Sequence, residues 1–227
     1  ADQRIEGVEV LCRWEDPILG SVSPSDFIAV AEATEQINLL GSWLIDTVFA
    51  QAGPWLSMPR GLQYVSINVS PLQLHHEGLI RVLRDGLERH GLNPGQIMLE
   101  ITENQNFDHN SGARQRLLAL DQLGFTLAMD DYGTGYSGLQ RLHTLPFGAV
   151  KVDRCLIDAI ETDRLQQTML LGVVHLQNSA GMRVVIEGVE RLEQCHTLLN
   201  LGCRLGQGFL FSKPIQAEQL DHLLKAA

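Results

Sequence analysis

Short apolar runs rich in Val, Ile and Phe alternate with longer segments of helical periodicity, and this alternation restricts the fold more than any other feature. It is typical of a parallel sheet, either a doubly wound layer or a closed barrel, because parallel strands must be joined by crossovers that are usually helical. The runs predict strands within 7–13, 63–68, 97–101, 125–129, 148–152, 182–186 and, more weakly, 204–209.

The segments between the runs predict helices, and several of them end on a glycine where a helix commonly closes with positive φ. A (β/α)8 barrel needs eight strands, so seven runs leave one strand to be expected upstream of residue 1. Ala1 is not a methionine, and we expect the chain to be a piece of something longer. The predicted helices are 43–53, 71–91, 112–124, 165–180, 190–202 and 217–227.

Length and charge restrict the function. The 227 residues fit one α/β barrel domain. The net charge of −10 argues against a binder of polymeric nucleic acid, which needs clustered Lys and Arg. A small phosphate ligand remains compatible, because bound divalent cations reverse the local sign of a site. The four cysteines have no CxxC spacing, which favours a reducing cytoplasm without disulfides.

Polar residues gather where the predicted strands end, and active sites of parallel α/β folds form at those carboxyl ends. A single acid there would more simply cap the next helix. Capping does not require a lysine or a glutamine, nor an acid inside an apolar run such as Glu100. The residues concerned are Glu9, Asn68, Glu100, Glu103, Asp130, Asp131, Lys151, Asp153, Glu187 and Gln207.

Carboxylate and amide oxygens are the ligands that Mg²⁺ and Mn²⁺ prefer, and so many carboxylates would repel one another without a cation. We therefore predict a metal site. In the first run, strand alternation puts Glu9, Leu11 and Arg13 on one face, and a guanidinium there suits a phosphate. A surface position for Arg13 remains the alternative.

The segment 133–138 matches GxGxxG after a strand, with Asp153 about twenty residues on, as in dinucleotide-binding folds. Two aspartates directly precede its first glycine, where a pyrophosphate would meet like charges, so we disfavour this interpretation.

With these residues in place, the chain resembles the EAL phosphodiesterase domain family. Its signature tripeptide reads Glu9-Val10-Leu11 instead of Glu-Ala-Leu. By alternation Val10 faces the surrounding helices, so the substitution should affect packing more than coordination. The matching segments are GVEVLCRW (7–14), INVSPLQL (67–74), LEITE (99–103), DDYGTGYSGLQRL (130–142), VKVDR (150–154), VVIEGVE (184–190) and GCRLGQGFLFSKP (202–214).

The resemblance implies a TIM-like (β/α)8 barrel with an irregular, antiparallel first strand, and a single EAL domain over 1–227. The family usually carries a further strand before its signature motif. The implied reaction is hydrolysis of one phosphodiester bond of cyclic di-GMP to linear pGpG, with two Mg²⁺ or Mn²⁺ ions per active site.

Residue roles are implied by the same resemblance. Glu9, Asn68, Glu100 and Asp130 resemble ligands of one cation. A second would be held by Asp130, Asp131 and Glu187, with Asp153 close by. Lys151 and Glu187 resemble the residues that position and deprotonate the attacking water. Glu103 resembles the residue that fixes the 131–138 loop and thereby couples metal binding to a dimer interface. The positions associated with substrate are Leu11, Arg13, Asp153, Gln207 and Pro214.

The family also implies partners: a homodimer, and sensor or GGDEF domains elsewhere in a longer signalling protein. A cytoplasmic domain is expected, with membrane attachment through an N-terminal part left open. Three other functions remain as alternatives. They are a catalytically weak receptor for cyclic di-GMP, a dinucleotide-binding fold, and another metal-dependent barrel such as an enolase-like enzyme.

Overall fold

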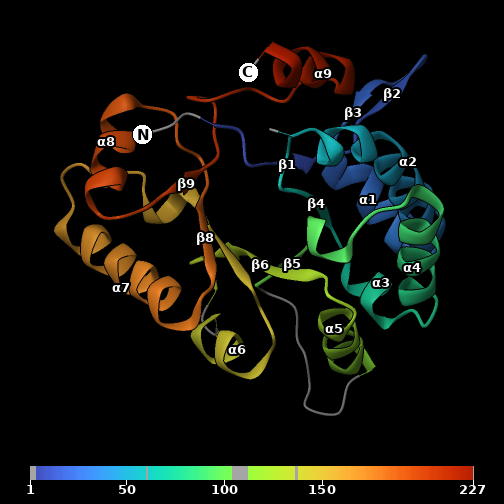
Figure 1. Ribbon diagram of the computed structural model, residues 1–227, viewed down its shortest axis with the longest axis horizontal. Helices are drawn as coiled ribbons and strands as arrows, with labels where there is room; N and C mark the ends of the chain where they lie inside the picture. The colour runs from blue at the N-terminus through green and yellow to red at the C-terminus, as the bar shows by residue number, and fades with distance from the viewer. Residues whose placement is uncertain (1–3, 60, 104–111, 136–137, 227) are drawn as a thin grey trace. The chain divides into compact units, whose positions relative to one another are not determined.

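The computed structural model describes residues 4–59, 61–103, 112–135 and 138–226. Its main sheet has seven strands, and each lies largely within one of the seven predicted runs (Figure 1). The β1/β4, β6/β7, β7/β8 and β8/β9 pairs are parallel, and helices connect the strands, as in the predicted TIM-like α/β class. In spatial order the strands are β1 (Gly7–Val10), β4 (Tyr64–Asn68), β5 (Ile97–Thr102), β6 (Thr126–Tyr132), β7 (Ala149–Val152), β8 (Arg183–Ile186) and β9 (Leu205–Gly206).

The first predicted strand is too long. β1 ends at Val10, and residues 11–13 have no regular structure before a short antiparallel hairpin of β2 (Trp14–Asp16) and β3 (Gly20–Val22). The side chain of Asp16 accepts hydrogen bonds from the backbone of Ile18 and Leu19, which turns the chain back on itself. The resemblance implies an antiparallel first strand, which we expect upstream of residue 1. β1 runs parallel to β4, so β1 is not that strand, and the antiparallel strand stays a prediction.

Most predicted helices are present, with two differences. The predicted helix 71–91 is two helices, because His76 is extended and its ring accepts the N–H of Gly78. Helices α1 and α6 were not predicted. The helices are α1 (Pro24–Ala33), α2 (Ile37–Ser57), α3 (Pro71–His75), α4 (Leu79–His90), α5 (Gly112–Gln122), α6 (Gly138–Thr144), α7 (Arg164–Ala180), α8 (Leu192–Asn200) and α9 (Ala217–Ala226), with 3-10 turns η1 (Pro94–Gln96) and η2 (Arg154–Leu156).

The chain divides into two compact units that interleave in sequence. The first comprises residues 1–99, 107–125 and 216–227, and the second 100–106 and 126–215. Fully buried Phe49 and Leu83 belong to the core of the first unit, and fully buried Leu127 and Met129 to that of the second. Burial of each such side chain contributes about 1.5–3 kcal/mol.

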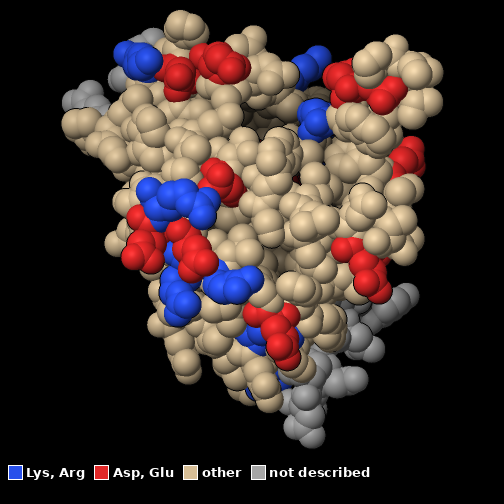
Figure 2. Space-filling model, turned by 90° about the vertical axis from the view of Figure 1, so that its right-hand side faces the viewer, with Lys and Arg blue, Asp and Glu red and all other residues tan. Residues whose placement is uncertain are grey.

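The described helices include none that is long and apolar enough to cross a membrane. On the face shown in Figure 2, basic side chains lie among acidic ones. Arg89 of α4 and Asp46 of α2 form an ion pair between exposed side chains.

Candidate metal-binding active site

Asp130 and Asp131 lie near the end of β6, where the strand is irregular. Met129 pairs with Val150 but Tyr132 pairs with Val152, so β6 has one residue more than β7 between these pairs. Asp131 takes up this bulge with φ of 56°, a left-handed conformation that aspartate tolerates better than most residues. Consecutive side chains of a regular strand point to opposite faces. The bulge removes this alternation.

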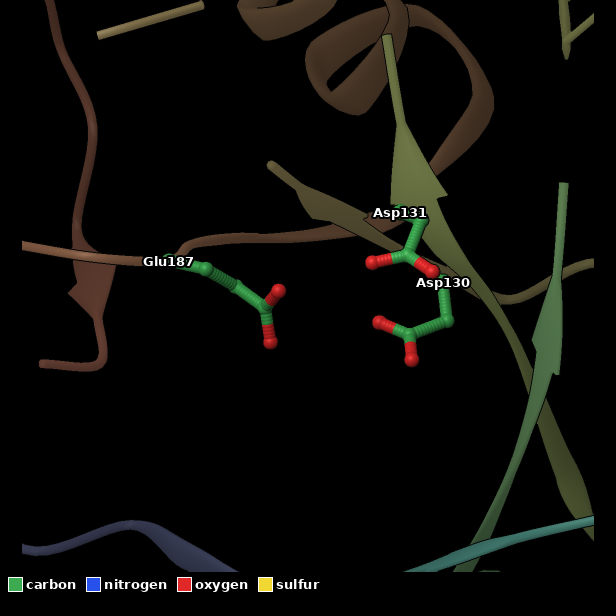
Figure 3. Close-up of side chains that lie close together, drawn as sticks. All are labelled: Asp130, Asp131 and Glu187. Carbon is green, nitrogen blue, oxygen red and sulfur yellow. The ribbon is translucent and has the colours of Figure 1, made fainter. Parts of the chain in front are cut away.

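The two carboxylates therefore approach a third. Glu187 follows the last residue of β8, and one oxygen from each of Asp130, Asp131 and Glu187 lies within 4.8 Å of the others. Figure 3 shows the three side chains converging from the two segments. Three converging carboxylates are a suitable donor set for a hard divalent cation.

Lys151 of β7 forms the charged centre of this cluster. Its Nζ lies 2.8 Å from Glu100 Oε2, 2.7 Å from Glu187 Oε1 and 3.2 Å from Asp130 Oδ1. The lysine is only 3% exposed and Glu100 only 1%. One ammonium thus contacts three carboxylates. Asp131 adds a fourth carboxylate, which has an oxygen within 4.8 Å of oxygens of Asp130 and Glu187. Four carboxylates gathered at one buried to half-buried site favour the binding of a cation.

Asp130 has spare capacity for such a cation. Its Oδ1 is buried and lies near the Lys151 ammonium, yet it has no hydrogen bond within the described part of the chain. A buried acceptor of this kind is expensive unless another group satisfies it. The carboxylates of Asp130, Asp131 and Glu187 therefore fit a bound divalent ion.

Glu103 holds the start of the loop that follows β6. The carboxylate is buried, and its Oε2 accepts the backbone N–H groups of Gly133 at 3.0 Å and Gly135 at 3.2 Å. Burial, and secondarily the charge of Glu103, raises the pKa of Tyr132 above its usual value. The two glycine amides of the GxGxxG segment already have an anionic acceptor, so they are not disposed to cradle a pyrophosphate. Positions 136 and 137 of that segment are outside the described residues.

Glu9 and Asn68 form a pair of their own in the first unit. Asn68 Nδ2 donates to Glu9 Oε1 at 3.0 Å, and the two residues come from neighbouring parallel strands. The predicted ligands are thus brought together in two sets, this pair and the Lys151 cluster.

Asp153 directly follows β7 and caps η2, because its Oδ1 accepts the N–H of Cys155 at 2.9 Å. Its role as a metal ligand stays a prediction. Burial, and secondarily Asp153, raises the pKa of the Cys155 thiol to about 11.

The other residues predicted to contact substrate lie on several different segments. Leu11 and Arg13 are exposed beyond the end of β1, so the strand alternation invoked for Arg13 was wrong. The Arg13 guanidinium donates to the carbonyl oxygen of Cys12. Gln207 follows β9, and its N–H bonds Ile186, the residue before Glu187. Pro214 is exposed, and its role stays a prediction.

Gln194 is a supporting residue that the sequence analysis missed. It is 1% exposed, accepts the N–H groups of Glu190 and Arg191, and donates to the carbonyl oxygen of Ile157. It therefore ties together the segments that follow β7 and β8. A glutamine three residues into a helix is a weak capping signal in sequence, and nothing local indicates its second partner.

Residues 1–214 match the EAL domain family, and the chain belongs to that family. It is 36% identical to MucR of Pseudomonas aeruginosa, a bifunctional diguanylate cyclase/cyclic di-GMP phosphodiesterase, over 94% of this chain and 31% of MucR. It is 35% identical to the oxygen sensor protein DosP of Escherichia coli, over 94% of this chain and 27% of DosP. The chain thus spans about a quarter to a third of these two relatives.

The fold of the chain is also similar to solved structures. The PaMucR phosphodiesterase in complex with c-di-GMP superimposes with a TM-score of 0.85 at 36% identity, covering 95% of this chain and 87% of that one. A manganese and cyclic di-GMP complex of Klebsiella pneumoniae BlrP1 gives a TM-score of 0.77 at 35% identity, covering 89% and 50% of the two chains.

Proposed function

We propose that this chain is a phosphodiesterase that hydrolyses one phosphodiester bond of cyclic di-GMP to linear pGpG with the help of Mg²⁺ or Mn²⁺. The observation that carries the proposal is the cluster around Lys151, in which Glu100, Asp130 and Glu187 contact one buried ammonium. Asp131 lies within reach of the same carboxylates. Relatives that are cyclic di-GMP phosphodiesterases support the choice of substrate.

Asp130, Asp131 and Glu187 would hold one cation through their converging oxygens. Glu9, Asn68, Glu100 and Asp130 would hold another, in the role that the family resemblance implies, and Asp153 would stand beside the first. When bound, two such ions polarise the phosphate and stabilise the attacking and leaving oxygens of an in-line displacement.

Glu187 and Lys151 would handle the attacking water. The Lys151 ammonium lies 2.7 Å from Glu187 Oε1, and this contact fixes the orientation of the carboxylate. A Glu187 carboxylate fixed in this way would accept a proton from a water held between it and the phosphate. Lys151 also offsets part of the repulsion between Glu100 and Asp130.

Cyclic di-GMP is an anion and the chain has a net charge of −10, so the two repel each other. Binding of the dinucleotide therefore depends on the bound cations. Leu11, Arg13, Asp153, Gln207 and Pro214 are proposed to contact it. Arg13 is exposed, so its guanidinium can leave the Cys12 carbonyl for a phosphate at little cost.

We also propose that the chain acts as a single EAL domain within a longer signalling protein that carries sensor or GGDEF domains. The names of longer relatives, an oxygen sensor and a bifunctional cyclase/phosphodiesterase, support this. A homodimer and a cytoplasmic site of action are part of the same proposal.

The test is incubation of the chain with cyclic di-GMP and Mg²⁺ or Mn²⁺, beside Glu9→Ala and a matched control, Glu88→Ala. Glu88 is an exposed acid of α4 and is not one of the proposed ligands. We expect pGpG from the unsubstituted chain and from Glu88→Ala, but not from Glu9→Ala. If the nucleotide binds but stays intact, the chain is a receptor. If it neither binds nor reacts, the proposed activity is wrong.

A further inference from the structure

Two glycines that neighbour the metal-binding acids contact opposite ends of the same 3-10 turn, η2. Gly133 lies two residues after Asp131, and a Cβ atom on it would lie 2.5 Å from Leu156 Cδ1. Gly188 directly follows Glu187, and a Cβ atom on it would overlap Arg154 Cβ, which is fixed to the backbone. The segments that follow β6 and β8 are therefore both in van der Waals contact with η2.

This turn is itself held firmly. The Asp153 side chain accepts the N–H of Cys155, and the Asp153 carbonyl accepts that of Leu156 at 3.1 Å. The Asp153 N–H donates to Tyr132 of β6 at 3.1 Å. Leu156 is only 8% exposed, so it packs against Gly133 from a buried position.

The next residue is also tied to the segment beyond β8. Gln194 donates to the Ile157 carbonyl at 3.3 Å and accepts the N–H groups of Glu190 and Arg191 at 3.0 Å each. This hydrogen-bonded turn thus stands between two loops. Asp130 and Asp131 lie near the end of the strand before the first loop, and Glu187 begins the second.

We infer that η2 is a spacer that sets the separation of Asp130 and Asp131 from Glu187, and thereby the cation affinity of these three carboxylates. Leu156 and the backbone and Cβ of Arg154 act as positioning groups, since they fix where Gly133 and Gly188 lie. Octahedral ions such as Mg²⁺ tolerate little error in ligand placement, so a small displacement of Glu187 weakens binding. The inference rests on the proposed metal-dependent function.

Gly188→Ala is the direct test, and Gly181→Ala is its matched control. The two glycines have nearly the same positive φ, 67° and 66°, so the left-handed φ strains alanine at both. A Cβ on Gly181, which ends α7, would meet nothing within 4 Å, whereas one on Gly188 would overlap Arg154. Both substitutions should lower the thermal midpoint of the metal-free chain.

Only Gly188→Ala should weaken Mn²⁺ binding, by roughly tenfold at one site. Binding is measured on the whole chain from the electron paramagnetic resonance signal of free Mn²⁺, without substrate. Adding Arg154→Gly removes the overlapping Cβ, so the double variant should recover the affinity of Gly181→Ala. Arg154→Gly alone gives the baseline for this comparison.

Leu156→Ala probes the other contact without introducing positive-φ strain. It should also weaken Mn²⁺ binding, whereas Leu198→Ala, which removes the same atoms from a buried leucine of α8, should not. Circular dichroism confirms that each variant is folded.

The outcomes separate the two proposals. If the unsubstituted chain binds no Mn²⁺, the metal-dependent function fails and the spacer fails with it. If it binds Mn²⁺ but Gly188→Ala and Gly181→Ala bind equally well, the spacer alone is overturned. The spacer is also overturned if adding Arg154→Gly to Gly188→Ala does not restore Mn²⁺ binding. It is likewise overturned if Leu156→Ala binds Mn²⁺ as tightly as Leu198→Ala does.

Discussion

The Lys151 ammonium lies 2.7 Å from Glu187 Oε1, and the same nitrogen contacts Glu100 and Asp130. Lys151 therefore reduces the repulsion within a dense set of carboxylates when no metal is bound. Its removal should affect the stability of the metal-free chain as well as the reaction.

Lys151→Met should destabilise the metal-free chain by about 3–5 kcal/mol, because three carboxylates lose the ammonium that they contact. Mn²⁺ should recover more stability in the variant than in the unsubstituted chain, since the cation then replaces the positive charge that Lys151 supplied. Thermal unfolding in EDTA and in Mn²⁺ measures both effects. Lys225→Met, at an exposed lysine of α9, is the control and should change neither. An unchanged midpoint in EDTA would contradict this role of Lys151.

Two substitutions of Asp131 separate the effect of its backbone conformation from the effect of its charge. Its φ of 56° suits asparagine but strains alanine, by roughly 1 kcal/mol. Asp131→Asn and Asp131→Ala remove the same charge, so urea unfolding in EDTA should show Asp131→Ala as less stable by about that amount. Both should lose Mn²⁺ affinity at one site in calorimetric titration. Equal stabilities would show that the bulge relaxes at no cost.

Much of this arrangement is predictable from local sequence. β-branched runs such as VVI at 184–186 identify the parallel strands, and the residues at their ends identify most of the candidate site. These predictions succeed because strand periodicity and the convergence of carboxyl ends are properties of any parallel sheet.

The remainder depends on contacts between distant residues. The bulge at Asp131 follows from the pairing of β6 with β7, and the sequence of β6 alone does not indicate it. The end of β1 at Val10 could not be predicted, because Leu11 and Cys12 continue its apolar pattern. Likewise, Gly188 has its significance only through Arg154, a residue 34 positions earlier.

Glu103→Gln should lower the pKa of Tyr132. Burial raises this pKa first and the Glu103 charge adds to it, so removing the charge lowers the value while burial still holds it above normal. The titration is followed by NMR of ring-labelled tyrosine, and Tyr132→Phe assigns its signal among the three tyrosines. Glu88→Gln, at an exposed residue of α4, should leave the titration curve of Tyr132 unchanged. Faster amide exchange at Gly133 and Gly135 should accompany the shift, because glutamine offers only one weaker acceptor.

The Cys155 thiol should react slowly with alkylating reagents, although the residue is exposed. Burial of part of the group and the neighbouring Asp153 raise its pKa to about 11, so only about one thiol in a thousand is ionised at pH 8. Alkylation by iodoacetamide, followed at this residue by mass spectrometry, should accelerate nearly tenfold per pH unit between pH 8 and pH 10. Asp153→Asn should lower the pKa and speed the reaction at pH 8, since asparagine can still accept the Cys155 N–H but carries no charge. Asp85→Asn, an exposed substitution in α4, should have no effect. Rapid alkylation of the unsubstituted chain at pH 8 would contradict the placement of Asp153 beside this thiol.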